Sequence, residues 1–247
     1  VANPTRFQCH TKVAQQFRRG RVFLAGDAAH TCSPAEGHGM NSGLQDAFNL
    51  AWKLALVCRG PCSDRLLDSY HAERRPVADT VTTSGDAAES AQMVEGMEER
   101  RARDAAIRSA LADPATRHHE AVAEAELNID YAASPIVLGD RHDLLWPGQR
   151  LPDAIPVWSA EAGAGMLHHH VNRGGHTAVL IGNSGTTGDD LIRVRDDLAR
   201  AVDGRLIEAT VAFTANAAVP DVGGRIEPAV ANGLGVDKIL LLVIRAD

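Results

Sequence analysis

The pattern of hydrophobic and polar positions in the first third of the chain predicts a strand, a loop and a helix, in that order. Val22–Ala25 is a short apolar run that ends at Gly26, which is typical of a buried parallel strand. Residues 26–43 are rich in Gly, Pro and Ser and predict a loop. Apolar residues then recur at the spacing of one helical face until Gly60-Pro61 ends the pattern. The members of this predicted apolar face are Leu44, Ala47, Phe48, Ala51, Leu54, Ala55 and Cys58.

Further helices are predicted in the middle of the chain. Ser63 is a candidate N-cap, and we expect Pro76 either to end the helix that follows or to start another. Residues 86–112 are rich in Ala, Glu and Arg and predict one or two solvent-exposed helices, broken at Asp113-Pro114. Residues 117–127 predict one more short helix.

The last part of the chain reads as a small α/β unit. Residues 132–160 contain four prolines and predict a loop, so we place a domain boundary there, with one domain at 1–140 and another at 141–247. The elements predicted after this loop are a strand at Thr177–Gly182, a helix at Asp189–Val202, and strands at Leu206–Phe213 and Ile239–Ile244.

Composition narrows the classes of function. The chain has 247 residues, 45% of them hydrophobic, and no apolar stretch approaches the length of a membrane span. Residues 1–76 hold 10 Lys/Arg and 6 Asp/Glu (+4), and the rest holds 15 and 26 (−11), which favours a small anionic ligand in the first part and argues against nucleic acid. The four cysteines are expected to be reduced thiols of a cytoplasmic protein. The start at Val1 has no signal-peptide pattern, and we expect the chain to be cut from a longer one.

Candidate chemistry is concentrated where the predicted strand ends. Gly26 has no side chain and permits close approach of a ligand. Asp27 lies at the carboxyl end of the strand, where ligands of open α/β sheets gather, and its carboxylate can accept hydrogen bonds from sugar hydroxyls. Pro34 stiffens the loop.

The start of the predicted helix adds a second candidate feature. Gly37 and Gly39 let the backbone press against a flat ring. Met40 and Asn41 lie at the helix start, where free backbone N–H groups carry a partial positive charge. Such a helix end suits an electron-rich carbonyl edge or a developing anion.

Residues Gly26–Asn41 resemble the second flavin-binding motif of class A flavoprotein aromatic hydroxylases, especially the phenol hydroxylase and 3-hydroxyphenylpropionate hydroxylase branch. The resemblance continues through Asn41–Leu54, Leu67–Tyr70 and Glu73–Ala78, and is strong over residues 20–79. It implies the tail of a Rossmann-like FAD-binding domain with a helical layer. Leu145–Asp153 resembles the entry into the family's thioredoxin-like C-terminal α/β domain.

The resemblance also implies roles for individual residues. Asp27 would hold the ribityl chain of FAD, and Pro34 would lie beside the reactive edge of the flavin. The backbone at Gly39, Met40 and Asn41 would meet the pyrimidine carbonyl. In such enzymes NADPH or NADH reduces the flavin, and one oxygen atom of O₂ is delivered to an aromatic substrate.

The sequence departs from the family in two ways. Glu36 and His38 stand where the family usually has a small residue and often has Gln, and a direct catalytic role for either is not expected. The family's N-terminal G-x-G-x-x-G turn is absent, so we expect this chain alone to bind FAD weakly or not at all and to be inactive.

Other readings stay open. The chain is either part of a hydroxylase of phenolic or polyketide-like aromatics, or an assembly module that forms a homodimer and has a vestigial flavin site. A related enzyme acting on a non-phenolic substrate is a third reading. No metal site is expected. His168-His169-His170 is expected at a surface or at a strand edge, His30 is expected to be a structural hydrogen-bonding residue, and Trp52 a core residue.

Overall fold

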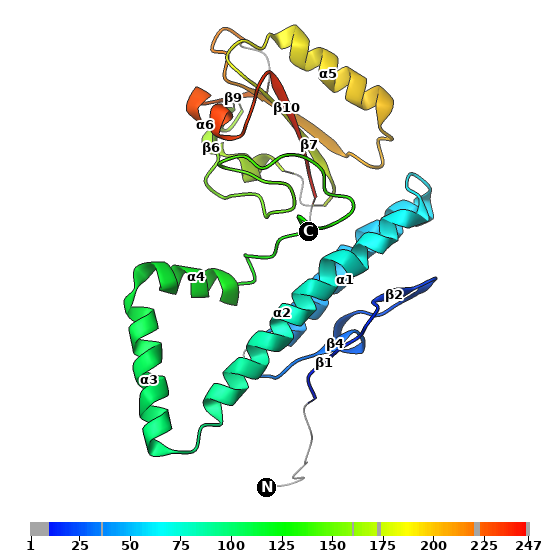
Figure 1. Cartoon of the computed structure of the whole chain (residues 1–247). Coiled ribbons are helices and arrows are strands. Elements are labelled where there is room, and N and C mark those ends of the chain that lie inside the picture. Colours follow the sequence, from blue (N-terminus) through cyan, green and yellow to red (C-terminus); the bar gives the residue numbers. More distant parts are fainter. Residues whose placement is uncertain (1–9, 36, 160, 172–173, 220–222, 246–247) are drawn as a thin grey trace. The chain divides into compact units, whose positions relative to one another are not determined.

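The computed structural model describes residues 10–35, 37–159, 161–171, 174–219 and 223–245. The chain divides into two compact units, Val1–Val57 with Asp64–Ile136, and Cys58–Ser63 with Val137–Asp247 (Figure 1). The predicted boundary between a domain at 1–140 and a domain at 141–247 stays a prediction.

The first unit begins with two pairs of very short antiparallel strands. Strand β1 (Lys12–Val13) pairs with β4 (His30–Thr31), and β2 (Arg18–Arg19) pairs with β3 (Val22–Phe23). The 3₁₀ helix η1 (Gly26–Ala28) lies between β3 and β4.

The expectation of a buried parallel strand over Val22–Ala25 is wrong. Gly20 has a φ of 60° and turns the chain, so that Val22–Phe23 pairs antiparallel with the preceding residues. The side chain of Val22 is exposed. Within the described part of the first unit, no strand runs parallel to this segment.

Helices make up the rest of the first unit. Their bounds are α1 (Gly39–Arg59), η2 (Asp64–Leu67), α2 (Asp68–Gln92), α3 (Met97–Ala112) and α4 (Pro114–Glu124). The predicted helix that stops before Gly60, and the break at Asp113-Pro114, are confirmed. Asp113 caps α4 by accepting hydrogen bonds from the backbone N–H groups of Ala115 and Thr116.

Pro76 neither ends nor starts a helix, contrary to the expectation, because α2 continues through it. A proline inside a helix removes one backbone hydrogen bond and costs about 3 kcal/mol. Buried residues on both sides, among them Arg74 and Ala78, are held by packing, which offsets that cost.

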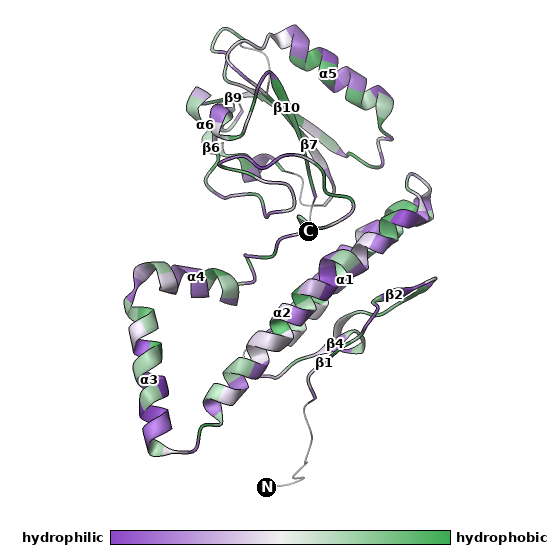
Figure 2. Cartoon of the chain, in the orientation of Figure 1, coloured by the Kyte–Doolittle hydropathy of each residue, from purple (hydrophilic) through white to green (hydrophobic). Residues whose placement is uncertain are grey.

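The predicted apolar face of α1 is wrong, although the helix itself is confirmed. Leu44 and Phe48 are 63% and 49% exposed. The buried positions of α1 are instead mostly polar or charged, namely Ser42, Asp46, Asn49, Leu50, Lys53 and Leu56. Hydrophilic and hydrophobic positions alternate along α1 and α2 (Figure 2). Polar side chains can be buried here because α2 supplies their hydrogen-bonding partners.

A small aromatic core holds the strands against the helices of this unit. Phe17 and Tyr70 are fully buried, and Phe17 stacks on the ring of His30 with 6.1 Å between centroids. The hydroxyl of Tyr70 donates to the carbonyl oxygen of Leu24 at 2.7 Å. Burial raises the pKa of Tyr70, so this donor keeps its proton.

The second unit is built on one mixed six-stranded sheet. Its strands are β5 (Pro156–Ser159), β6 (Gly163–Met166), β7 (Thr177–Gly182), β8 (Ala209–Thr214), β9 (Gly224–Ile226) and β10 (Ile239–Ile244). They lie in the order β10-β7-β8-β9-β5-β6, and only the β7-β8 and β8-β9 pairs are parallel. The helical segments are η3 (Leu167–His170), α5 (Gly188–Ala201) and α6 (Pro228–Gly233).

The strongest patterns of the second unit are confirmed. Strands β7 and β10 have the predicted bounds, and both are hydrophobic in Figure 2. Helix α5 begins with a capping box between Thr187 and Asp190. The unit therefore has a mixed α/β architecture. Among the described residues, no helix is long and apolar enough to cross a bilayer.

Candidate functional site

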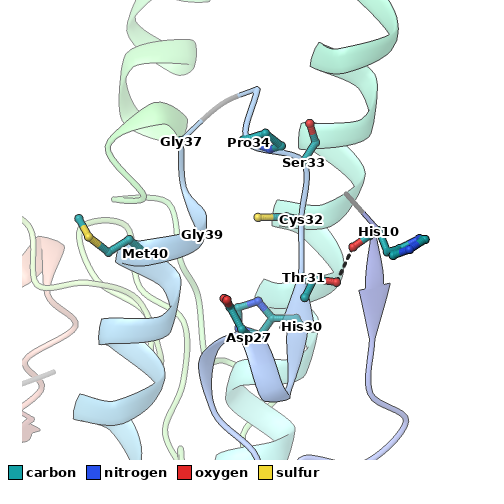
Figure 3. Close-up of a pocket in the computed structure, with 10 residues that line it drawn as sticks. All are labelled: His10, Asp27, His30, Thr31, Cys32, Ser33, Pro34, Gly37, Gly39 and Met40. Atoms are coloured by element: carbon teal, nitrogen blue, oxygen red, sulfur yellow. Dashed lines mark hydrogen bonds between the residues drawn. The ribbon is translucent and has the colours of Figure 1, made fainter. Parts of the chain in front are cut away.

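The predicted motif lines one open cleft of ≈ 680 Å³ in the first unit, a volume typical of small-molecule sites. The chain passes along one side through Thr31, Cys32 and Ser33, and returns along the other through Gly37 and Gly39 (Figure 3). The lining residues are His10, Asp27, His30, Thr31, Cys32, Ser33, Pro34, Gly37, Gly39 and Met40. Of the seven predicted site residues, the cleft brings together Asp27, Pro34, Gly37, Gly39 and Met40.

Gly26 and Asn41, the other two predicted site residues, adjoin the cleft without lining it. Gly26 precedes Asp27 in η1. Asn41 is an exposed residue in the first turn of α1.

The N-terminal turn of α1 presents backbone donors at one end of the cleft. The first helical hydrogen bond runs from the N–H of Ser42 to the carbonyl oxygen of His38, at 3.0 Å. The N–H groups of Gly39, Met40 and Asn41 therefore have no partner within the helix. The Met40 side chain points away from the cleft and is 75% exposed, so its backbone is what faces the site (Figure 3).

The glycines of the cleft leave room that a side chain would take. Gly37 has a φ of 76°, a conformation that side chains other than glycine rarely adopt. A Cβ on Gly39 would lie 3.2 Å from the Cys32 Sγ, across the mouth of the loop. The cleft is therefore bounded by backbone rather than by side chains at Gly37 and Gly39.

Gly26 allows a close approach between η1 and α1. Its Cα would lie 3.3 Å from a Cβ built on Gly43 of α1. The turn that carries Asp27 is thereby pressed against the helix that carries the free amides. This contact fixes the two predicted halves of the site relative to each other.

A buried hydrogen-bonded cluster behind the cleft supports the same turn. Asp46 of α1 accepts from the Gly26 N–H at 3.1 Å and lies 2.7 Å from the His30 Nε2. The Arg74 Nε of α2 donates to the other oxygen of Asp46 at 2.7 Å. Both side chains of the Asp46–Arg74 pair are fully buried. His30 is therefore a structural hydrogen-bonding residue, as predicted, and it also lines the cleft.

A second buried charge cluster follows one turn along α1. The Lys53 Nζ lies 2.6 Å from Glu73 Oε2, and Asn49 donates to the same oxygen at 2.8 Å. The Ser134 hydroxyl donates to the other oxygen of Glu73 at 2.6 Å. Lys53 and Glu73 have no exposed side-chain surface.

The clusters shift the acidity of their members. Burial opposes the charge of Asp46, but the hydrogen bonds from His30 and Arg74 outweigh it and hold the pKa of that carboxyl below its usual value. Burial likewise disfavours charge on Arg74, yet Tyr131 and Asp46 raise the pKa of its guanidinium. Both groups therefore stay charged inside the fold.

Sequence reasoning did not single out Asp46, Lys53, Glu73 and Arg74 as functional residues. A signal for them was present, because Asp46, Asn49 and Lys53 recur at helical spacing along α1. Charged residues at helical spacing can form a face that is buried and ion-paired, as well as a face that is exposed to solvent.

The other residues named from the sequence are Glu36, three consecutive histidines and Trp52. Glu36 lies outside the described residues. His168, His169 and His170 form the 3₁₀ helix η3 of the second unit, not a strand edge. Trp52 is only half-buried, so it is not the core residue that was expected, and its ring lies 5.4 Å from the Lys53 Nζ.

The first unit is similar in sequence to known flavoproteins. Residues 2–84 match the model of the FAD binding domain family. A protein named "Putative polyketide hydroxylase" from Streptomyces halstedii is 60% identical over 81 residues, which are 33% of this chain and 14% of that protein. Pentachlorophenol 4-monooxygenase of Sphingobium chlorophenolicum is 57% identical over 74 residues, 30% of this chain and 14% of that protein.

A likeness to solved structures extends over both units. OxyS anhydrotetracycline hydroxylase from Streptomyces rimosus has a TM-score of 0.65 and 29% identity, over 96% of this chain and 41% of that one. The predicted resemblance to FAD-dependent aromatic hydroxylases is thus confirmed. The chain spans less than half the length of this relative.

Proposed function

We propose that this chain is part of an FAD-dependent monooxygenase that hydroxylates a phenolic or polyketide-like aromatic compound with NAD(P)H and O₂. The observation that carries the proposal is the cleft at residues 26–41. There a carboxylate, Asp27, and the unpaired amides of α1 face one space, on a segment that matches the FAD binding domain family.

The residues of the cleft fit FAD by their chemistry. Asp27 is exposed and would accept hydrogen bonds from the ribityl hydroxyls. The amides of Gly39, Met40 and Asn41 would donate to the pyrimidine carbonyl edge, where the helix end favours negative charge. Pro34 and Gly37 would border the ring. FAD, when bound, supplies the redox chemistry by accepting reducing equivalents from the nicotinamide and activating O₂.

We further propose that the second unit is a thioredoxin-like domain. Its β7-α5-β8 crossover with β10 antiparallel to β7 supports this assignment. Its two cysteines, Cys58 and Cys62, are separated by three residues, so they do not form the Cys-x-x-Cys pair of disulfide exchange. Its part in the protein would be structural. The alternative of an assembly module with a vestigial flavin site is less favoured, because the named relatives are monooxygenases.

The test combines this chain with the complementary N-terminal part of a relative. Co-expression is expected to give a complex that keeps flavin absorbance through gel filtration and oxidises NAD(P)H, whereas the chain alone is expected to retain little flavin. Dimerisation of the chain without any flavin in the complex would instead favour the assembly module.

Substitution of Asp27 in the co-expressed complex tests the role of this residue in FAD binding. Asp27→Ala is expected to weaken FAD binding about tenfold, or ~1.4 kcal/mol, because charge-assisted hydrogen bonds to the ribityl chain are lost. Asp79→Ala is the matched control, since Asp79 is a half-exposed carboxylate on α2 outside the cleft. Equal FAD affinities in a titration of the two variants would contradict the assigned role of Asp27.

A further inference from the structure

His38 immediately precedes the first turn of α1, and its side chain faces two carboxylates from another part of the first unit. Its Nε2 lies 3.4 Å from Glu124 Oε2, and its Nδ1 lies 3.8 Å from Glu126 Oε1. The His38 side chain is 12% exposed, Glu126 is 7% exposed, and Glu124 is 69% exposed. The residue between the cleft glycines Gly37 and Gly39 is thus tied to the end of α4.

Glu126 is held in place more firmly than an ordinary loop residue. Its φ of 54° is the only positive value at a described residue other than glycine, a conformation that the surrounding structure must impose. Gln45 of α1 donates from Nε2 to the Glu126 carboxylate, and accepts at Oε1 from the Arg74 Nη1 at 3.2 Å. The Glu126 carboxylate is thereby linked to the buried Asp46–Arg74 pair.

The pair formed by His38 and Glu126 is incompletely satisfied. Among the described residues, neither His38 Nε2 nor Glu126 Oε1 has a hydrogen-bonding partner, and both atoms are buried. A buried carboxylate oxygen without a hydrogen bond is stabilised by a nearby positive charge. A protonated imidazole donates from both nitrogens, whereas a neutral one donates from only one, so the protonated ring alone can serve both carboxylates.

We propose that His38 is a positioning residue, whose protonated ring bridges Glu126 and Glu124 and so orders the first turn of α1 for its ligand. The proposal rests on the proposed function only for the identity of that ligand. The charged groups that face the ring within the described residues are these two carboxylates, with Arg74 connected through Gln45. Loss of the positive charge on the ring would remove the bridge and leave the first turn of α1 less ordered.

Hydrogen exchange of the whole chain, without FAD, tests the bridge. Histidine changes charge between about pH 5 and about pH 8. After correction for intrinsic rates, we expect the amide of Ser42, which donates to the carbonyl oxygen of His38, to exchange about fivefold faster or more at the upper pH, as for a typical coupling between two sites. Glu126→Gln and His38→Gln are expected to remove this pH dependence, and Glu124→Gln to reduce it less, because Glu124 is solvent-exposed.

Glu120→Gln is the matched control, since Glu120 is an exposed carboxylate on α4, and it should behave as the unmodified chain does. Protection of the peptides from α2 shows whether each variant is folded. If Glu126→Gln unfolds, His38→Gln remains as the test of the bridge, because its neutral side chain still donates one hydrogen bond. A pH-independent first turn in the unmodified chain, or an unchanged pH dependence in the folded variants, would overturn the proposal.

A titration of the co-expressed complex with FAD separates this inference from the proposed function. Absence of FAD binding together with a pH-dependent first turn would contradict the proposed function alone. FAD binding together with a pH-independent first turn would contradict the His38 bridge alone.

Discussion

Asp46 and Arg74 join the two long helices of the first unit through a fully buried ion pair. Removing one partner of such a pair leaves an uncompensated charge in the interior, which costs about 3–5 kcal/mol. We therefore expect Arg74→Ala to lower the free energy of unfolding by about that amount in urea denaturation. The adjacent Arg75→Ala is the control, because its pair with Asp79 is partly exposed, and its cost should be about 1 kcal/mol or less. Equal losses in the two variants would mean that the buried pair contributes no more than the surface one.

The lowered pKa of Asp46 gives the first unit a predictable sensitivity to acid. A carboxyl whose pKa is depressed on folding adds stability above its unfolded-state pKa of about 3.9, and loses it as the pH falls through the folded-state value. Asn at this position does not titrate. The free energies of unfolding of the unmodified chain and of Asp46→Asn should therefore converge as the pH falls from about 5 toward about 3. Urea titrations across this range would contradict the assignment if the difference between the two stayed constant.

For single residues, the sequence indicates the chemistry of a side chain better than it indicates which residue that side chain contacts. Asp27 and the amides at Met40 were predicted from a carboxylate at the end of an apolar run and from a helix start, and they line one cleft. The Asp46–Arg74 pair was not predicted, because 28 residues separate the two along the chain. Periodicity reports which residues share a helix face, but whether a polar face is solvated or paired depends on what packs against it.

At the scale of elements, the contact between α1 and η1 depends on two glycines. Gly→Ala inside a helix normally stabilises by about 0.5–1 kcal/mol, because the unfolded chain loses flexibility. On Gly43 the added methyl would meet the Gly26 Cα at 3.3 Å, whereas on Gly85 of α2 it would meet Ser33 at an ordinary 3.6 Å. We expect Gly43→Ala to be less stable than Gly85→Ala by about 1 kcal/mol, since overpacking costs about 1–3 kcal/mol. Thermal unfolding of the two variants measures the difference, and a more stable Gly43→Ala would show that the turn carrying Asp27 is free to shift.

Elements were predictable where the hydrophobic pattern was long or continuous. Strands β7 and β10 are six-residue apolar runs, and their bounds came from sequence alone. The short strands β5, β6 and β9 were missed, because Gly163–Met166 and Gly224–Ile226 contain glycine and lack an extended alternation. The apolar face of α1 was misassigned because Leu44 and Phe48 follow helical spacing, yet α2 packs on the polar side.

For the whole molecule, the two units have separate hydrophobic cores. One core contains Phe17 and Tyr70, the other contains Ile181 and Phe213, and the two clusters share no residue. Replacing a buried side chain by Ala costs about 3–5 kcal/mol for Phe and about 2–5 kcal/mol for Ile, and that cost belongs to the cooperative unit that loses the contact. We expect Phe17→Ala to lower the midpoint of one calorimetric transition, and Ile181→Ala that of a second, each leaving the other within about 1 °C. The half-exposed Val243 of β10 provides a control, because Val243→Ala should move neither midpoint appreciably. A single transition that both core substitutions lower together would show that the units unfold as one, and that the cleft of the first unit draws its stability from the second unit as well.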